Sequence, residues 1–187
     1  MFSMRNIPNF ISFLRILLVP PVVFYLLEQN YMPALILFAI AGISDGIDGW
    51  LAKHFSWQSA LGEILDPLAD KLLLVSTYIC FSWLELLPQW LVVSVILRDV
   101  VIIAGGVLYR VNFGKVEIKP SYVSKFNTLM QIVLIVVMLV SLVWFSIDEL
   151  IMTVLIWTVL VTTIASGLMY VFSWGLRAVQ AAKKSDS

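Results

Sequence analysis

The sequence predicts an all-α integral membrane protein with six transmembrane helices and both termini on the cytoplasmic side. Two observations lead to this fold class. The chain of 187 residues is 61% hydrophobic, and its mean hydropathy is +0.98. Its apolar runs also reach the length of about 20 residues that a helix needs to cross roughly 30 Å of hydrocarbon. These runs lack the alternating pattern of a membrane barrel, so we expect helices.

Six segments have the length and composition of membrane-crossing helices. In chain order they cover about residues 10–28, 31–53, 66–84, 88–109, 122–146 and 149–174. The chain length leaves room for one domain, which we expect to cover residues 1–187. Residues 1–9 are predicted to form a short interfacial segment, because Phe2, Met4 and Ile7 can lie against lipid.

The charged residues outside the apolar runs predict the orientation. With six spans, the basic residues fall on one side: Arg5, Lys53, Arg110, Lys115, Lys119, Arg177, Lys183 and Lys184. The opposite loops carry acidic residues and no Lys or Arg: Glu28, Glu85, Asp148 and Glu149. Because cytoplasmic loops are enriched in Lys and Arg, both termini are predicted to be cytoplasmic. No targeting segment is evident, and we expect a bacterial inner membrane.

Four aspartates lie at the predicted cytoplasmic ends of the second and third spans. Asp45 and Asp48 are three residues apart, and Asp66 and Asp70 are four apart, so each pair shares a helix face. The short connection between the spans predicts that the two helices are antiparallel neighbours and that the pairs converge. Carboxylates beside lipid cost free energy unless they are paired, hydrated or bound to metal.

Several explanations compete for these aspartates. Asp66 can cap the third helix, with Pro67 in its first turn. Lys53 and Lys71 can form salt bridges, but two lysines do not neutralise four carboxylates. Hard oxygen ligands favour Mg²⁺ or Mn²⁺, and an intramembrane carboxylate cluster is also compatible with an ion or proton transporter. Transporters place such groups nearer to the middle of the membrane, which favours a metal-dependent enzyme here.

Glycines accompany the aspartates. Gly49 and Gly62 leave room for a ligand near the backbone, whereas Gly42 and Gly46 by themselves are better explained by close helix packing.

The complete motif resembles the signature of the CDP-alcohol phosphatidyltransferase family. It has the form Asp45-x2-Asp48-Gly49-x2-Ala52-Lys53-x8-Gly62-x3-Asp66-x3-Asp70, and it departs from the family at Lys53, where arginine is usual. Lysine supplies charge to a phosphate but not the bidentate fork of arginine. The stretch Asn6-x-Pro8-Asn9-x2-Ser12-x2-Arg15 is similar to the family's first helix. Residues 119–128 resemble CMP-forming cardiolipin synthases and, less closely, phosphatidylglycerophosphate synthases.

The resemblance implies transfer of the phosphatidyl group of CDP-diacylglycerol to an alcohol, with release of CMP. It implies two divalent ions, Mg²⁺ or Mn²⁺, held by Asp45, Asp48, Asp66 and Asp70, and a general-base role for Asp70. Residues near the CDP-lipid would be Ser12, Gly49, Ala52, Lys53 and Gly62. It further implies a homodimer, and no nucleic-acid partner is expected. The acceptor is expected to be phosphatidylglycerol, with glycerol-3-phosphate as the alternative.

Five basic residues are candidates for an acceptor pocket: Arg15, Arg98, Arg110, Lys119 and Lys125. For three of them, the sequence leaves a role other than acceptor binding open. Arg98 adjoins Asp99 and can form a local ion pair, and Arg15 and Lys125 can instead extend toward the membrane interface.

Overall fold

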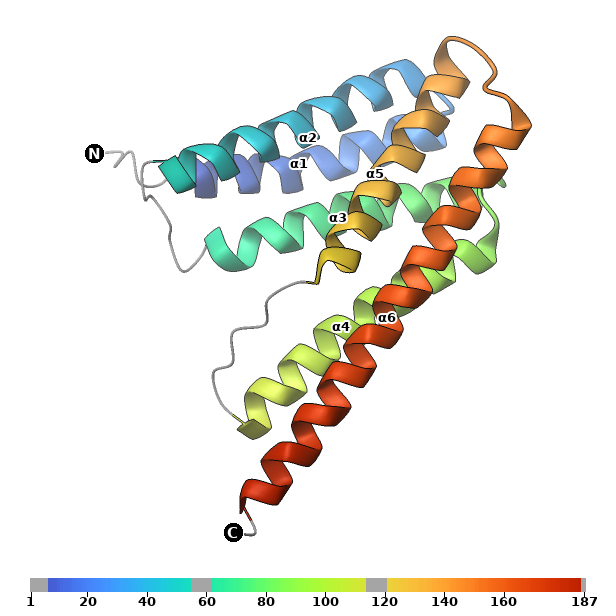
Figure 1. Cartoon of the computed structure of the whole chain (residues 1–187). Helices are drawn as coiled ribbons and strands as arrows, with labels where there is room; N and C mark the ends of the chain where they lie inside the picture. Colours follow the sequence, from blue (N-terminus) through green and yellow to red (C-terminus); the bar gives the residue numbers. More distant parts are fainter. Residues whose placement is uncertain (1–6, 55–61, 114–120, 186–187) are drawn as a thin grey trace. The chain divides into compact units, whose positions relative to one another are not determined.

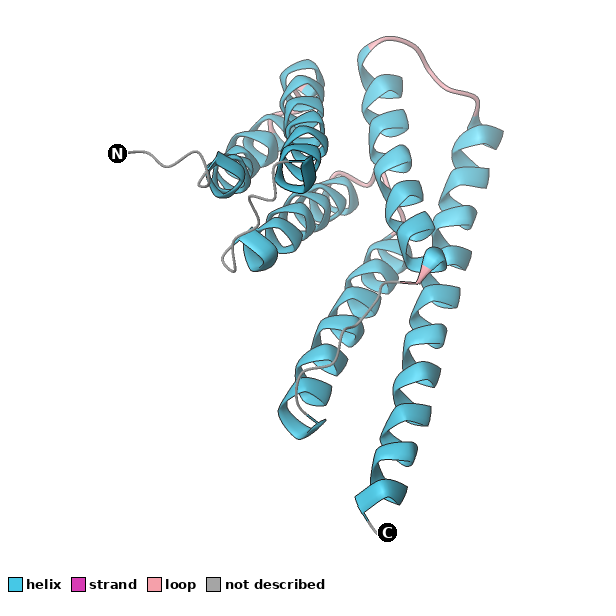
Figure 2. Ribbon diagram, turned by 60° about the vertical axis from the view of Figure 1, so that its left-hand side comes forward, coloured by secondary structure: helices cyan, strands magenta, loops and turns pink. Residues whose placement is uncertain are grey.

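The computed structural model describes residues 7–54, 62–113 and 121–185, and it describes side chains in 13–46, 68–105 and 121–172. The described part is helical, and no strand occurs in it (Figures 1 and 2). In chain order the helices are α1 (Ile7–Leu27), α2 (Tyr31–His54), α3 (Gly62–Trp83), α4 (Gln89–Phe113), α5 (Tyr122–Val143) and α6 (Glu149–Ser185).

The helices follow the predicted segments, with differences at the ends. Residues 7–9 begin α1, so this part of the predicted interfacial segment belongs to the first helix; residues 1–6 lie outside the described residues. Helix α6 continues to Ser185, well beyond the predicted end at 174. Its extension, with Arg177, Lys183 and Lys184, is polar, so hydropathy alone ended the prediction where the apolar run ends.

Two described helical segments are long and apolar enough to cross a membrane, Tyr122–Val143 and Glu149–Phe172. Phe13–Leu27 and Tyr31–Gly46 are shorter apolar helical segments. The all-helical class is therefore confirmed for the described residues. The count of six spans and the cytoplasmic termini stay predictions.

The chain divides into two compact units. The first comprises Met1–Leu87 and Ile135–Ile147, and the second comprises Pro88–Leu134 and Asp148–Ser187. In the first unit, α1 packs against both α2 and α3. In the second, α4 packs against α6. Whether the whole chain forms one domain stays a prediction.

Large apolar side chains form the core of each unit. In the first unit, Leu26 of α1, Phe38 of α2 and Phe81 of α3 are almost fully buried. In the second, Leu91 of α4 and Val159 of α6 are equally buried. Burial of such a side chain contributes about 1.5–3 kcal/mol when the alternative is water, but lipid competes with it in a membrane.

Helices α1 and α3 end in the same way. Gln29 and Glu85 have φ angles of 56° and 59°, in the left-handed region that favours glycine. One residue later, Asn30 N–H donates to Tyr25 C=O at 2.9 Å, and Leu86 N–H donates to Phe81 C=O at 2.8 Å. This is the Schellman arrangement, which satisfies carbonyls at the end of a helix. Both helices therefore stop before an acidic loop although neither has a glycine there.

Candidate functional site

Arg15 of α1 joins the two described aspartates of the motif. Its Nη1 forms an ion pair with Asp45 Oδ1 of α2 at 2.7 Å and donates a hydrogen bond to Asp70 Oδ1 of α3. Because α1 packs against both helices, one guanidinium nitrogen reaches carboxylates that lie 25 residues apart in sequence (45 and 70). One aspartate of each motif pair therefore contacts Arg15 of α1. We call Arg15, Asp45 and Asp70 the open cluster.

Burial is uneven within the open cluster. The Arg15 side chain is 1% exposed, whereas the side chains of Asp45 and Asp70 are 41% and 40% exposed. The cation therefore lies inside the helix bundle of the first unit, and the carboxylates lie at its surface. A buried guanidinium is favourable only when anions and hydrogen bonds compensate its desolvation, and here two carboxylates supply the counter-charge.

This arrangement corrects two expectations. Helices α2 and α3 were predicted to be direct neighbours, but in the described part of the chain the extensive contacts of each are with α1. Lys53 and Lys71 were considered as counter-charges for the aspartates, and the structure adds Arg15, which the sequence analysis had not considered in that role. Nor does Arg15 extend to the interface, since it is almost fully buried. Only the packing of α1 could have shown this.

The other motif residues have described backbone only. Asp48, Gly49, Ala52 and Lys53 lie in the last part of α2, and Gly62 and Asp66 lie in the first part of α3. Ser12 lies in α1, one turn before Arg15. Their side chains are outside the described residues, so their predicted roles stay predictions. The helical register does place Asp48 on the face of Asp45, and Asp66 on the face of Asp70.

Gly42 and Gly46, which lie on either side of Asp45 in the sequence, do not serve close packing in the described structure. A Cβ built on Gly42 or Gly46 would meet nothing within 4 Å, and both residues are exposed in the described structure. The helix-packing alternative is therefore not supported for either glycine.

The open cluster fits a divalent cation by its chemistry. Two carboxylates from different helices converge on a point that already holds a positive charge, and they are open to solvent. Oxygen donors of this kind suit Mg²⁺ or Mn²⁺. Among the described side chains no group of three or more metal-ligating residues occurs, and Asp48 and Asp66 lie outside that set. A metal site thus stays a prediction that the donor set supports.

A second arginine forms a closed polar cluster in the second unit. Arg98 of α4 pairs with Asp99 through Nη1 at 2.7 Å. Its Nη2 donates to Ser166 Oγ of α6 at 2.7 Å and also to Ser124 Oγ of α5, and its Nε lies 3.2 Å from Ser166 Oγ. The ion pair with Asp99 is the alternative that the sequence left open for Arg98. We call Arg98, Asp99, Ser124 and Ser166 the closed cluster.

The closed cluster has neighbours that the sequence analysis gave no role. Asn127 of α5 is fully buried, and its Oδ1 accepts hydrogen bonds from Thr162 at 2.8 Å and Thr163 at 2.9 Å. Ser124 and Asn127 are three residues apart on α5, and Thr163 and Ser166 are three apart on α6. This spacing of polar residues within apolar helices was visible in the sequence and predicts a polar seam between two helices.

For the remaining acceptor candidates, the structure gives little evidence of a binding role. Lys125 is exposed, and its Nζ lies 6.0 Å from the ring centroid of Tyr122, at the limit of a cation–π contact. Arg110 lies in α4 with its side chain outside the described part, and Lys119 is outside the described residues altogether. No acceptor pocket can be built from these three.

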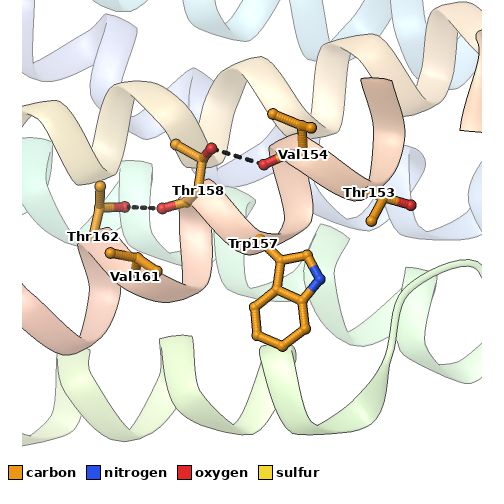
Figure 3. A pocket seen from close by; sticks show the side chains of 6 residues that line it. All are labelled: Thr153, Val154, Trp157, Thr158, Val161 and Thr162. Carbon is orange, nitrogen blue, oxygen red and sulfur yellow. Dashed lines mark hydrogen bonds between the residues drawn. The ribbon is translucent and has the colours of Figure 1, made fainter. Parts of the chain in front are cut away.

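A groove of about 370 Å³ runs along α6 in the second unit, and Figure 3 shows its lining side chains, Thr153, Val154, Trp157, Thr158, Val161 and Thr162. The Thr158 and Thr162 hydroxyls donate to backbone carbonyls one turn earlier, Val154 and Thr158, at 2.7 and 2.8 Å. With Thr158 and Thr162 bonded to carbonyls of their own helix and no charged group in the lining, the groove suits lipid chains and not phosphate.

Comparison with known proteins gives the class to which this site belongs. The sequence profile of the CDP-alcohol phosphatidyltransferase family matches residues 5–165. The chain belongs to this family. The matched region includes all four motif aspartates and Arg15.

Relatives within the family carry two kinds of name. Over 194 residues the chain is 34% identical to the cardiolipin synthase (CMP-forming) of Rattus norvegicus, covering 95% of this chain and 64% of the relative. It is 34% identical over 184 residues to CDP-diacylglycerol–glycerol-3-phosphate 3-phosphatidyltransferase 1, chloroplastic, of Oryza sativa subsp. japonica, covering 88% and 56%. The corresponding Blochmanniella floridana protein is 30% identical over 182 residues, covering 92% of both chains. The chain thus spans less than two thirds of the length of the first two relatives.

Proposed function

We propose that this protein transfers the phosphatidyl group of CDP-diacylglycerol to an alcohol and releases CMP. The observation that carries the proposal is the convergence of Asp45 and Asp70, at two motif positions of the family, on one point open to solvent. Family membership favours this reaction over ion transport. An interfacial site suits a substrate whose acyl tails stay in lipid while the nucleotide leaves to water.

Asp45, Asp48, Asp66 and Asp70 are the residues that would hold two Mg²⁺ or Mn²⁺ ions. When bound, such ions neutralise the pyrophosphate and the charge that develops as CMP departs. The chain itself contributes the placement of the carboxylates on α2 and α3. Helix α1 fixes their separation, because Arg15 contacts one from each helix.

Asp70 is the proposed general base. Its carboxylate is 40% exposed, so an acceptor hydroxyl can approach it. The proton of that hydroxyl passes to a carboxylate oxygen of Asp70, the hydroxyl oxygen forms a bond to the phosphorus of the phosphatidyl group, and the bond to the CMP oxygen breaks. Ser12, Gly49, Ala52, Lys53 and Gly62 are the proposed contacts of the CDP-lipid, with Lys53 supplying charge to a phosphate.

Phosphatidylglycerol is the proposed acceptor, which makes the product cardiolipin. The resemblance around residues 119–128 supports it, as do the cardiolipin synthases among the relatives. Relatives named for glycerol-3-phosphate keep that acceptor as the second candidate. The closed-cluster contacts occupy Arg98, and Arg15 is buried against Asp45 and Asp70, so Arg110, Lys119 and Lys125 are the candidates left for a phosphorylated acceptor.

One experiment tests both levels of the proposal. The purified protein is reconstituted with labelled CDP-diacylglycerol, Mn²⁺ or Mg²⁺, and either phosphatidylglycerol or glycerol-3-phosphate, and the lipid products are separated. Labelled cardiolipin with CMP release is the expected result. Phosphatidylglycerophosphate as the product would show that glycerol-3-phosphate is the acceptor and would leave the proposed class of reaction unchanged. No CMP release with any acceptor, from well-folded protein, would refute the proposed activity.

The setting of the enzyme is part of the proposal. We propose six membrane spans in a bacterial inner membrane, with the site facing the cytoplasm, and a homodimer. The clustering of Lys and Arg supports the orientation. Labelling of cysteines introduced at Lys115 and Glu85 by an impermeant reagent checks it, since only the latter should react from outside. Cross-linking in native membranes checks the dimer.

A further inference from the structure

Arg15 occupies the place where the motif carboxylates meet. Its Nη1 contacts Oδ1 of Asp45 and Oδ1 of Asp70 with the same nitrogen, and its side chain is buried in the first unit. Two carboxylates that lie so close would repel each other without an intervening cation. The protein thus carries a positive charge of its own at the point where the family motif predicts a metal.

We propose that Arg15 is a resident counterion that competes with the divalent metal for Asp45 and Asp70. The inference rests on the proposed function, because it takes the two aspartates as metal ligands. An oxygen atom that contacts a guanidinium donates less electron density to a metal, and the guanidinium also occupies part of the space around that oxygen. Metal and Arg15 therefore weaken each other's hold on the carboxylates, and this coupling is reciprocal.

The uneven burial of the open cluster supports competition over permanent pairing. Both carboxylates are about two-fifths exposed, so a hydrated ion can reach them from solvent without any movement of the helices. Arg15 is almost fully buried in the first unit, so it forms the inner part of the cluster. The closed cluster offers no such access, since Arg98 and Asp99 are both at most 7% exposed.

Competition gives Arg15 a role as a positioning residue. Before metal and CDP-lipid arrive, it keeps α2 and α3 attached to α1 and neutralises part of the negative charge. It also sets the metal concentration at which the site is filled, because metal binding must overcome the existing ion pairs.

The test measures metal affinity apart from turnover. Mn²⁺ binding to purified wild-type protein and to Arg15→Gln is followed by electron paramagnetic resonance of free Mn²⁺, without CDP-lipid. We expect Arg15→Gln to bind Mn²⁺ about tenfold more tightly, within the usual range of coupling between two ligands. Unchanged or weaker binding overturns the proposal, because Arg15 would then be neutral toward the metal or needed to organise its ligands.

Three further variants control for misfolding and for a general loss of positive charge. Arg15→Met preserves the apolar stem and should also bind Mn²⁺ about tenfold more tightly. Arg15→Lys keeps the charge and should stay within about threefold of wild type. Lys125→Gln removes an exposed cation outside the open cluster and should leave Mn²⁺ affinity unchanged. A tighter affinity in Lys125→Gln as large as that in Arg15→Gln would show a general charge effect and would also overturn the proposal.

A turnover assay on the same wild-type preparation separates this inference from the proposed function. If the wild type forms phosphatidyl product but Arg15→Gln and Arg15→Met bind Mn²⁺ no more tightly, only the counterion role fails. If the wild type binds Mn²⁺ yet transfers no phosphatidyl group to any acceptor, the proposed activity fails while competition at the carboxylates is still measured.

Discussion

The two units each bury an arginine in a long apolar helix, but they surround it differently. Arg15 meets two carboxylates from other helices, both half-exposed. Arg98 meets the carboxylate of the next residue and two serine hydroxyls, all of them buried. In the open cluster one guanidinium contacts two carboxylates, and both carboxylates are partly exposed. In the closed cluster the charges balance and solvent is excluded.

This difference separates a site from a structural contact. An excess of accessible carboxylate attracts a further cation, which is what a metal-dependent transferase needs. A balanced, buried pair with its hydrogen bonds satisfied has little left to offer a ligand, and it holds α4, α5 and α6 in register within the second unit. The comparison predicts that changes in the open cluster affect chemistry, and that changes in the closed cluster affect stability.

The largest effect is expected from Asp70→Asn. The amide cannot take a proton from the acceptor, and general-base catalysis is worth about 10²–10⁴ in rate. Turnover should fall by at least that factor, while CDP-lipid still binds. CMP release and CDP binding by calorimetry are the two measurements, with Asp99→Asn as the matched change in the closed cluster. Full activity of Asp70→Asn would remove the base assignment.

The next largest effect is expected from Arg98→Met in the closed cluster. Removal of one partner leaves Asp99 buried without its counter-charge, which costs about 3–5 kcal/mol in comparable buried pairs. Thermal unfolding in detergent should show a large drop in melting temperature. Asp45→Asn in the open cluster is the matched variant, and it should destabilise less, because Arg15 keeps its contact with the Asp70 carboxylate. Equal losses of stability in the two variants would contradict the distinction between the clusters.

A moderate effect is expected at Lys53, the position where the motif departs from the family. Lys53→Ala should raise the KM for CDP-diacylglycerol about tenfold with little change in kcat, because it removes charge from substrate binding. Lys53→Arg should stay within about twofold of wild type if the position supplies only charge. Steady-state kinetics on mixed micelles measure both. A severe loss in Lys53→Arg would show a site that is specific for lysine.

The smallest effect is expected outside both clusters, at the end of α3. Glu85 has a φ of 59°, and left-handed backbone costs a side-chain-bearing residue about 1 kcal/mol relative to glycine. Glu85→Gly should therefore raise the melting temperature slightly and leave CMP release unchanged. Glu85→Ala keeps the strain and serves as the control. Destabilisation by Glu85→Gly would mean that the acidic side chain contributes more than its backbone costs.

The helical elements were predicted well, and the motif was recognised, because both depend on residues that are close together in the sequence. Apolar run length depends on nearby residues, and the spacing of Asp45, Asp48, Asp66 and Asp70 fixes which of them share a helix face. The end of α6 was placed too early, since a polar helical extension carries no hydropathy signal. Arg98 and Asp99 are adjacent, so their ion pair could be anticipated.

Arg15 shows what local patterns cannot supply. Its contact with Asp70 joins residues 55 positions apart, and nothing in the spacing of either motif reveals it. The same holds for Asn127 with Thr162 and Thr163, which meet across α5 and α6. Polar residues in apolar helices indicate that each has a polar partner. Which residue is that partner depends on how the helices pack.

By itself, the sequence determined the helical class, the family motif and the acidic character of the site, because period, composition and spacing act along the chain. The tertiary structure alone decided that α1 packs against both α2 and α3, and that its arginine is the cation between their carboxylates. The physical reason is that a buried charge must find its counter-charge wherever packing brings one, and packing joins residues without regard to their distance in sequence.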